Sequence, residues 1–145
     1  MPGIVVGVDG SEHSQRVLEW AVREAALRHA PLTVLTVHQV AGSHWTGNPI
    51  IYPEDQPEQE KAGQAAEEAV SQVVSRVGDA RPPSVTVRAV SGLAARELIA
   101  ASSDADLVVV GSRGGGGFAG LLMGSVSSQV VNHADCPVVV IRGQR

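Results

Sequence analysis

Five short apolar runs, separated by stretches with helical periodicity, constrain the fold of this chain more than any other feature. The runs are rich in β-branched residues and lack the polar alternation of a half-exposed strand, which is typical of strands buried on both faces of a parallel sheet. They are Ile4 to Val8, Leu32 to Val37, Val85 to Val90, Asp106 to Val110 and Val138 to Ile141. The alternation predicts an α/β fold, a doubly wound open parallel five-stranded sheet with helices on both faces.

Four helices are expected between these runs. Ser11 is a good N-cap for the first, in which apolar residues recur at helical spacing from Val17 onward. The others are expected over Glu58 to Val77, Leu93 to Ala101 and Leu121 to His133. The segment from Ala41 to Pro57 has three prolines and two glycines, so we expect a long irregular loop there, whose role stays open.

Length and composition indicate one domain that covers residues 1–145. The formal net charge of −4 argues against nucleic acid or an anionic membrane as a main partner, because both prefer a basic surface. Cys136 is the only cysteine, so no internal disulfide can form, and we expect it to be a small core residue. The chain shows no signal-peptide pattern and no apolar run of about 18 residues, and a cytoplasmic location is expected.

Glycine is concentrated after the fourth apolar run, in GSRGGGGFAGLLMGS from Gly111 to Ser125. A glycine loop between a strand and a helix N-terminus lets backbone N–H groups approach a phosphate closely. Arg113 is the only cation in the loop, and it is either a phosphate contact or a solvated side chain. The loop itself is either a phosphate cradle or a plain connection.

Established phosphate and catalytic motifs do not match this segment. A P-loop needs a lysine, and the only lysine of the chain is Lys61. The G-x-G-x-x-G fingerprint is absent after the first run, and no G-x-S-x-G nucleophile elbow is present. The spacing that fits is G-x2-G-x9-G-[ST], which Gly111, Gly114, Gly124 and Ser125 satisfy.

With this motif, the stretches VGVDGS, DADLVVVGSRG and CPVVVIR make the whole chain resemble the ATP-binding branch of the universal stress protein family. The resemblance implies a Rossmann-like domain in which Gly111 approaches the ribose. It assigns phosphate donors to five further residues, which are Gly114, Gly124, Ser125, Val126 and Ser127. Asp9 is implied to face the adenine side or a divalent metal, magnesium or manganese, and the Val37 backbone to read the adenine edge. For Asp9 a purely capping role remains an alternative.

The functions that follow are an ATP-binding stress-response regulator, a binder of cyclic AMP or AMP, or an interaction scaffold that binds no nucleotide. No general base, lysine clamp or nucleophile stands out, so at most weak ATPase activity is expected. An AMP-forming ligase is disfavoured, because VGVDGS lacks the double-glycine loop of that class. The resemblance also implies a homodimer through Val138 to Ile141, with regulatory partners unknown.

Overall fold

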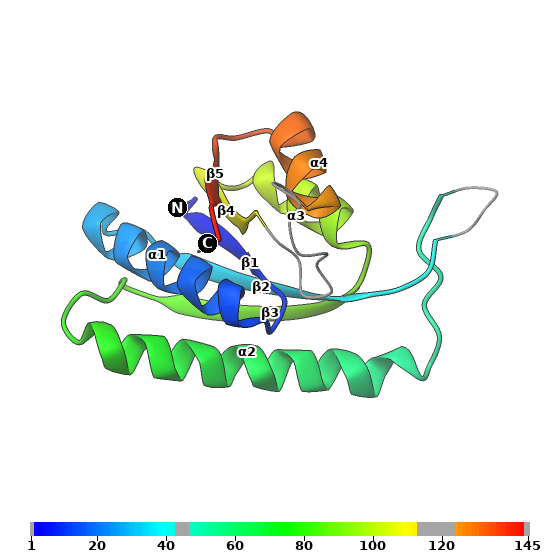
Figure 1. Ribbon diagram of the computed structural model, residues 1–145, viewed down its shortest axis with the longest axis horizontal. Helices are drawn as coiled ribbons and strands as arrows, with labels where there is room; N and C mark the ends of the chain where they lie inside the picture. Colours follow the sequence, from blue (N-terminus) through cyan, green and yellow to red (C-terminus); the bar gives the residue numbers. More distant parts are fainter. Residues whose placement is uncertain (1, 43–46, 113–123, 144–145) are drawn as a thin grey trace.

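The computed structural model describes residues 2–42, 47–112 and 124–143. Its five strands form one parallel sheet in the order β3-β2-β1-β4-β5, as the alternation predicted (Figure 1). The strands are β1 (Ile4–Val8), β2 (Leu32–Gln39), β3 (Val85–Gly92), β4 (Leu107–Gly111) and β5 (Val138–Ile141). The helices are α1 (Glu12–Arg28), α2 (Asp55–Val77), α3 (Ala94–Ser102) and α4 (Ser125–His133).

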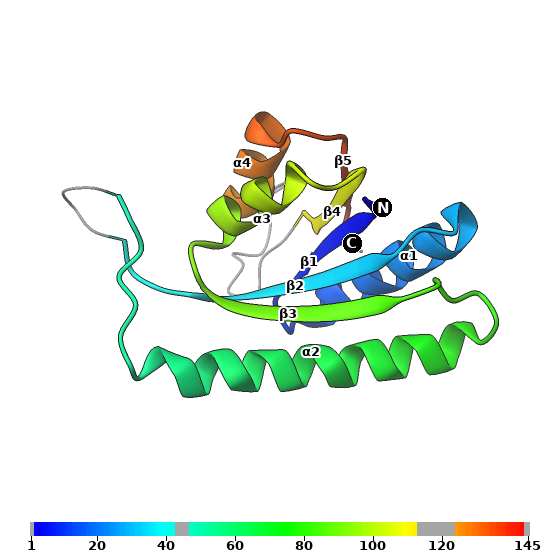
Figure 2. The same cartoon turned by 180° about the vertical axis from the view of Figure 1, so that it is seen from behind.

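Two apolar cores lie on opposite faces of the sheet. Side chains alternate along each strand, so Ile4 and Val6 of β1 pack under α1 and α2, whereas Val5 packs toward α3 and α4. The two views show α1 and α2 on one face and α3 and α4 on the other (Figures 1 and 2). Burial on both faces explains why the strands read as continuous apolar runs.

Three of the predicted elements are longer in the structure than the sequence indicated. The second strand continues to Gln39, the third to Gly92, and α2 begins at Asp55 rather than Glu58. The Asp55 carboxylate accepts the Tyr52 N–H at 2.7 Å and lies 2.9 Å from His38 Nε2, which fixes the first turn of α2. Pro57 fits in that turn because the first N–H groups of a helix have no intrahelical acceptor. For the fourth predicted helix, residues 125–133 are helical, and 121–123 lie outside the described residues.

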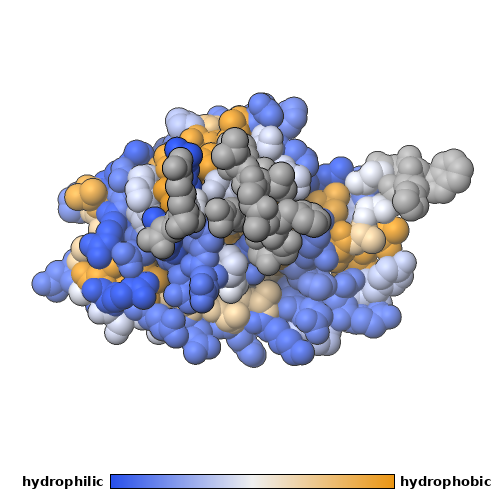
Figure 3. All heavy atoms as spheres, in the orientation of Figure 1, coloured by the Kyte–Doolittle hydropathy of each residue, from blue (hydrophilic) through white to orange (hydrophobic). Residues whose placement is uncertain are grey.

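The connection from β2 to α2 extends beyond the sheet in both ribbon views. Ile50 N–H donates to the Ala41 carbonyl at 2.9 Å, and Arg96 of α3 donates to Asn48 Oδ1 at 3.0 Å. Apolar side chains gather beside this connection in Figure 3. Two residues of the connection, Ile51 and Tyr52, are exposed. The predicted irregular segment therefore ends before Asp55, residues 43–46 of it lie outside the described residues, and Gly47 and Asn48 are tied to α3 by Arg96.

Candidate functional site

The strand order places a topological switch point between β1 and β4. The chain leaves β1 toward β2 and β3 on one side, then crosses back to add β4 and β5 on the other. In open parallel sheets, ligands bind beyond the carboxyl ends of the strands at such a point. Asp9 follows β1 and Gly111 ends β4, so the structure brings these two predicted residues to the same place.

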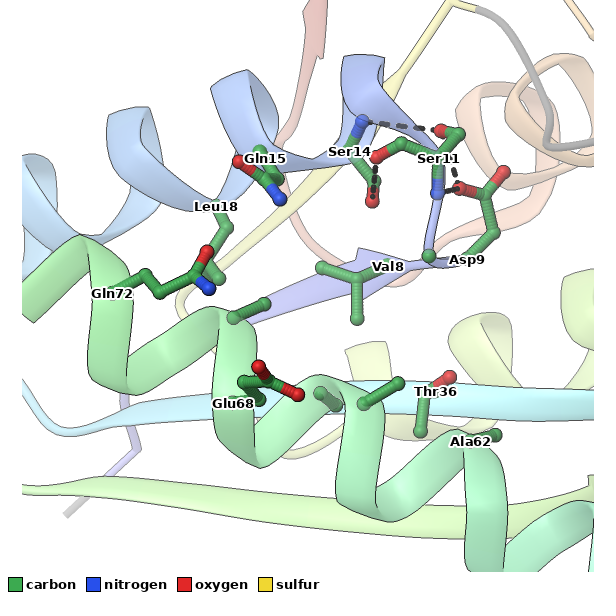
Figure 4. A pocket seen from close by; sticks show the side chains of 14 residues that line it. Val8, Asp9, Ser11, Ser14, Gln15, Leu18, Thr36, Ala62, Glu68 and Gln72 are labelled. Atoms are coloured by element: carbon green, nitrogen blue, oxygen red, sulfur yellow. Dashed lines mark hydrogen bonds between the residues drawn. The ribbon is translucent and has the colours of Figure 1, made fainter.

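Asp9 organises the start of α1. Its Oδ1 accepts hydrogen bonds from Ser11 N at 3.0 Å and from Ser11 Oγ at 2.6 Å. Ser11 in turn caps α1 by accepting the Ser14 N–H at 3.2 Å, which confirms the predicted N-cap (Figure 4). Within the described part of the chain Oδ2 of Asp9 makes no hydrogen bond, so one carboxylate oxygen supports the cap and the other is available to a ligand.

Gly111 lies against α1. A Cβ at this position would stand 2.8 Å from the His13 ring and 3.0 Å from Val17 Cγ2. The His13 ring is fixed because its Nε2–H donates to the Ile141 carbonyl at 3.1 Å. The absence of a side chain at Gly111 therefore permits the packing of α1 on β4, and the predicted ribose contact stays a prediction.

Ser112 joins three segments beside the switch point, and sequence reasoning missed it. Its carbonyl accepts the Gly124 N–H at 2.8 Å, and its Oγ accepts the Gly143 N–H at 3.1 Å. Its own N–H donates to the Ile141 carbonyl at 2.9 Å. A polar residue directly after a buried apolar strand was the available signal, because a serine that is 4% exposed needs partners.

The N-terminus of α4 lies next to this junction. The N–H groups of Ser125, Val126 and Ser127 have no acceptor within the helix, and they carry the positive end of its dipole. Ser125 is exposed, whereas the Ser127 hydroxyl donates to the Gly124 carbonyl at 3.1 Å. The predicted donors are therefore unequal, because the Gly124 N–H and the Ser127 hydroxyl already have partners. Arg113 and Gly114 lie outside the described residues.

Val37 lies on the opposite side of β1 from β4. Ile4 N donates to the Pro31 carbonyl, and Leu32 N to the Ser84 carbonyl, so odd-numbered residues of β2 direct their backbone groups toward β1. The pairing of β1 with β2 ends at Val8 and Thr36. The Val37 carbonyl therefore faces the loop after Val8, whereas its side chain packs toward α3 and α4.

A cavity of about 350 Å³ opens between α1 and α2 at the carboxyl ends of β1 and β2 (Figure 4). Val8 and Leu18 form its apolar floor, and Asp9 stands at one end. The α2 side is lined by Ala62, Ala65, Ala66 and Ala69. Sequence reasoning missed this cavity, although four alanines within eight residues of one helix were a visible signal.

The other titratable residues in the described part of the chain are dispersed. Among the described residues, no group of three or more His, Cys, Asp or Glu side chains is placed to hold a metal ion. Cys136 is partly buried against the α3–α4 core, and burial raises the pKa of its thiol, in keeping with a packing role. The backbone N–H of Tyr52 and the ring of His38 lower the pKa of Asp55.

The sequence profile of the universal stress protein family matches residues 2–142. The chain belongs to this family. A universal stress protein of Mycobacterium tuberculosis is 40% identical over 141 residues, which are 96% of this chain and 47% of that protein. A universal stress protein of Mycolicibacterium smegmatis is 37% identical, over 97% of this chain and 48% of its own. The chain therefore spans about half the length of these relatives.

Solved structures of the family share the fold. Universal stress protein UspA from Lactobacillus plantarum has a TM-score of 0.76 and 27% identity, with 97% of both chains covered. A universal stress protein in complex with cAMP has a TM-score of 0.66 and 26% identity, over 97% of this chain and 96% of that chain. The protein from Archaeoglobus fulgidus in complex with dAMP has a TM-score of 0.62 and 27% identity, over 97% and 98%. In the described part of this family member, no helix is long and apolar enough to cross a membrane.

Proposed function

We propose that this chain is a stress-response regulatory domain that binds ATP, together with magnesium or manganese, at the switch point between β1 and β4. The observation that carries the proposal is that β1, which is followed by Asp9, pairs with β4, and that Ser112 after β4 accepts the Gly124 N–H at the start of α4. Two structural relatives are complexes with adenine nucleotides, which supports this ligand class.

The described residues fit such a ligand in chemical terms. The backbone N–H groups of Ser125, Val126 and Ser127, with the Ser125 hydroxyl, would hold phosphate oxygens. Asp9 Oδ2 is an oxygen ligand of the kind that magnesium and manganese prefer, and these ions would neutralise phosphate charge. The Val37 carbonyl would accept a hydrogen bond from the base. Gly111 would lie beside the ribose, and Arg113 and Gly114 would complete the phosphate contacts.

The site is suited to holding a nucleotide more than to cleaving it. Lys61, the only lysine, lies on the exposed side of α2 and pairs with Glu58 at 3.4 Å, so it is no phosphate clamp. No described side chain near α4 stands as a general base for water. We therefore propose at most slow ATP hydrolysis and a regulatory effect through the bound state of a homodimer.

Cyclic AMP or AMP is the second candidate ligand, because the two related complexes contain cAMP and dAMP. Each of these carries one phosphate, for which the first turn of α4 has enough donors. A scaffold without a nucleotide is the remaining alternative.

Mass spectrometry of the small molecules released from purified protein tests the proposal. We expect ATP or another adenine nucleotide, and calorimetry with added ATP and magnesium should give saturable binding. Parallel titrations with cAMP and AMP rank the candidates. If no adenine nucleotide is released and none binds at millimolar concentration, the proposal is wrong and the scaffold function takes its place.

A further inference from the structure

The outer side of α1 carries a second hollow, which the proposed nucleotide site does not use. The helix lies at the surface of the molecule (Figure 1), and the open hollow beside it measures about 540 Å³. Arg76 of α2 and Ile141 of β5 contribute to its lining. The other lining residues all belong to α1 and form the α1 surface: Glu12, Gln15, Arg16, Glu19, Trp20 and Arg23.

The composition of this lining is typical of a protein–protein contact. Trp20 packs in part against the core beneath α1 and also lines the hollow, so its ring is held in place by the fold. The three cations of the lining are all arginines. Tryptophan and arginine are the residues that most often dominate the binding energy of protein interfaces, whereas lysine is depleted there.

Two opposite charges of the α1 surface have no partner within the described part of the chain. Glu19 is held by Arg23 at 3.5 Å and by Arg76 at 3.0 Å. Glu12 and Arg16 are one turn apart, a spacing at which such side chains pair readily, yet neither forms a hydrogen bond or an ion pair with another described residue. Both charges are therefore available to a second molecule.

The order of the charges makes the α1 surface complementary to itself. When two copies of a helix lie antiparallel, residues at equal distances from the middle of the contact face each other. Three pairs of lining residues have this spacing: Glu12 with Arg23, Arg16 with Glu19, and Gln15 with Trp20. Two of the three pairs bring opposite charges together, whereas a parallel alignment would place each charge against its own copy.

We infer that the α1 surface docks a second copy of this chain, with the two α1 helices antiparallel about a two-fold axis. The contact is separate from the β5 edge and needs no nucleotide, so the inference goes beyond the proposed function. One helix supplies nearly all of the surface, which places the contact in the small, weak class with an expected dissociation constant of about 0.1 mM. At micromolar concentration it stays open, and at high local concentration it joins copies that are otherwise separate.

Charge reversal at the two ends of the surface tests this arrangement. Glu12→Arg gives a copy with two arginine ends, and Arg23→Glu gives a copy with two glutamate ends. Each variant should repel itself twice in a two-fold contact, whereas an equimolar mixture of the two should associate. Glu60→Arg is the matched control, because it makes the same change at an exposed position of α2 outside the hollow. All variants also carry Val140→Pro at the sheet edge, so that pairing through β5 does not contribute, and thermal unfolding verifies that each one folds.

Sedimentation equilibrium at protein concentrations up to about 1 mM measures the association. We expect each single reversal to weaken self-association by about tenfold or more relative to the Val140→Pro parent, because like charges then face each other. The mixture should associate at least as strongly as the parent, and Glu60→Arg should match the parent. If Val140→Pro does not fold, the wild-type background gives the same comparison, and the mixture should then form a larger species than either variant alone.

Three results would overturn the inference. One is a parent that stays monomeric over the whole concentration range, and another is a single reversal that associates as strongly as the parent. The third is a mixture that stays monomeric although each reversal weakens association, because α1 would then meet some other surface. All measurements are made without nucleotide, so each of these results leaves the proposed function standing.

Discussion

Gly111 illustrates how one residue can belong to a ligand motif and to the core at once. A methyl group at this position would meet the His13 ring at 2.8 Å and Val17 at 3.0 Å, and both contacts are part of the packing of α1 on β4. We expect Gly111→Ala to lower the free energy of unfolding by about 1–3 kcal/mol, the usual cost of overpacking. Urea unfolding measures this change.

Gly42→Ala is the control for this prediction, because a Cβ there would meet its nearest atom at 3.8 Å, an ordinary contact. Equal stability of Gly111→Ala and wild type would mean that α1 shifts without cost. Loss of ATP binding in a Gly111 variant is informative only if the variant is as stable as wild type.

Asp55 links acidity to the stability of the connection between β2 and α2. The Tyr52 N–H and the His38 ring lower the pKa of this carboxyl in the folded protein. A carboxyl with a lowered folded pKa stabilises the fold fully above its ordinary value of 3.8, and that contribution is lost as the pH falls through the lowered value. We therefore expect wild type to exceed Asp55→Asn in stability at about pH 6, and this advantage to be smaller at about pH 3, below the ordinary value of 3.8.

Urea unfolding at both pH values gives the comparison. Glu54→Gln serves as control, because the neighbouring Glu54 does not cap α2 through its side chain. An unchanged difference between wild type and Asp55→Asn at the two pH values would contradict the prediction.

At the level of elements, the sequence predicted the interiors of the strands and helices better than their ends. β1 and β5 match the predicted runs, because apolar β-branched segments bounded by turn residues have few alternatives. The start of α2 was missed, because it depends on the pairing of Asp55 with His38, seventeen residues away. A window that reads local periodicity contains no information about such a contact.

The N-terminus of α4 allows a test in which stability and ligand binding change in opposite directions. A glutamate at position 125 would stabilise α4 by about 0.3–1 kcal/mol, because its negative charge interacts favourably with the positive end of the helix dipole. The same charge would repel a phosphate from the N–H groups of the first turn. We expect Ser125→Glu to retain or raise the melting temperature. We expect its affinity for ATP to fall by about tenfold or more, because the new carboxylate repels the negatively charged phosphates. Gln129→Glu, one turn further along the exposed side, should leave ATP affinity within about twofold.

Calorimetry and thermal unfolding of the two variants together check this prediction. If Ser125→Glu binds ATP as tightly as wild type, α4 is not part of the phosphate site. A fall in both stability and affinity would indicate instead that the helix start had been damaged.

At the scale of the whole molecule, the candidate site could be predicted only in part. Asp9 and Gly111 follow from the rule that ligands bind at switch points, and that rule needs only the strand order. Ser112 and His13 were not predicted as site residues, because their roles depend on which distant segments pack against them. The Ser112 hydroxyl accepts a hydrogen bond from the distant Gly143 N–H. The His13 ring is held by the carbonyl of Ile141, which is 128 residues away in the sequence.

The exposed edge of the sheet governs the predicted assembly. β5 pairs with β4 alone, and its four residues are partly exposed, which leaves an edge open to a second copy. The Pro137 carbonyl accepts the Val108 N–H of β4, and the Ile141 carbonyl accepts the N–H of Ser112, which follows β4. The backbone groups of Val138 and Val140 therefore point outward. Proline at position 140 therefore removes an outward N–H and no bond to β4, a change that edge strands tolerate.

We expect wild type to be a dimer at micromolar concentration and Val140→Pro to be a folded monomer, as measured by light scattering after size exclusion. Val140→Ala is the matched control, because it shortens the same side chain and keeps the N–H, so it should remain dimeric. If wild type is monomeric, or if Val140→Pro dimerises as strongly as Val140→Ala, pairing through β5 is wrong. Ser112 is hydrogen-bonded both to Ile141 of β5 and to Gly124 at the start of α4, so a dimer formed at this edge would be linked to the proposed phosphate site through this buried serine.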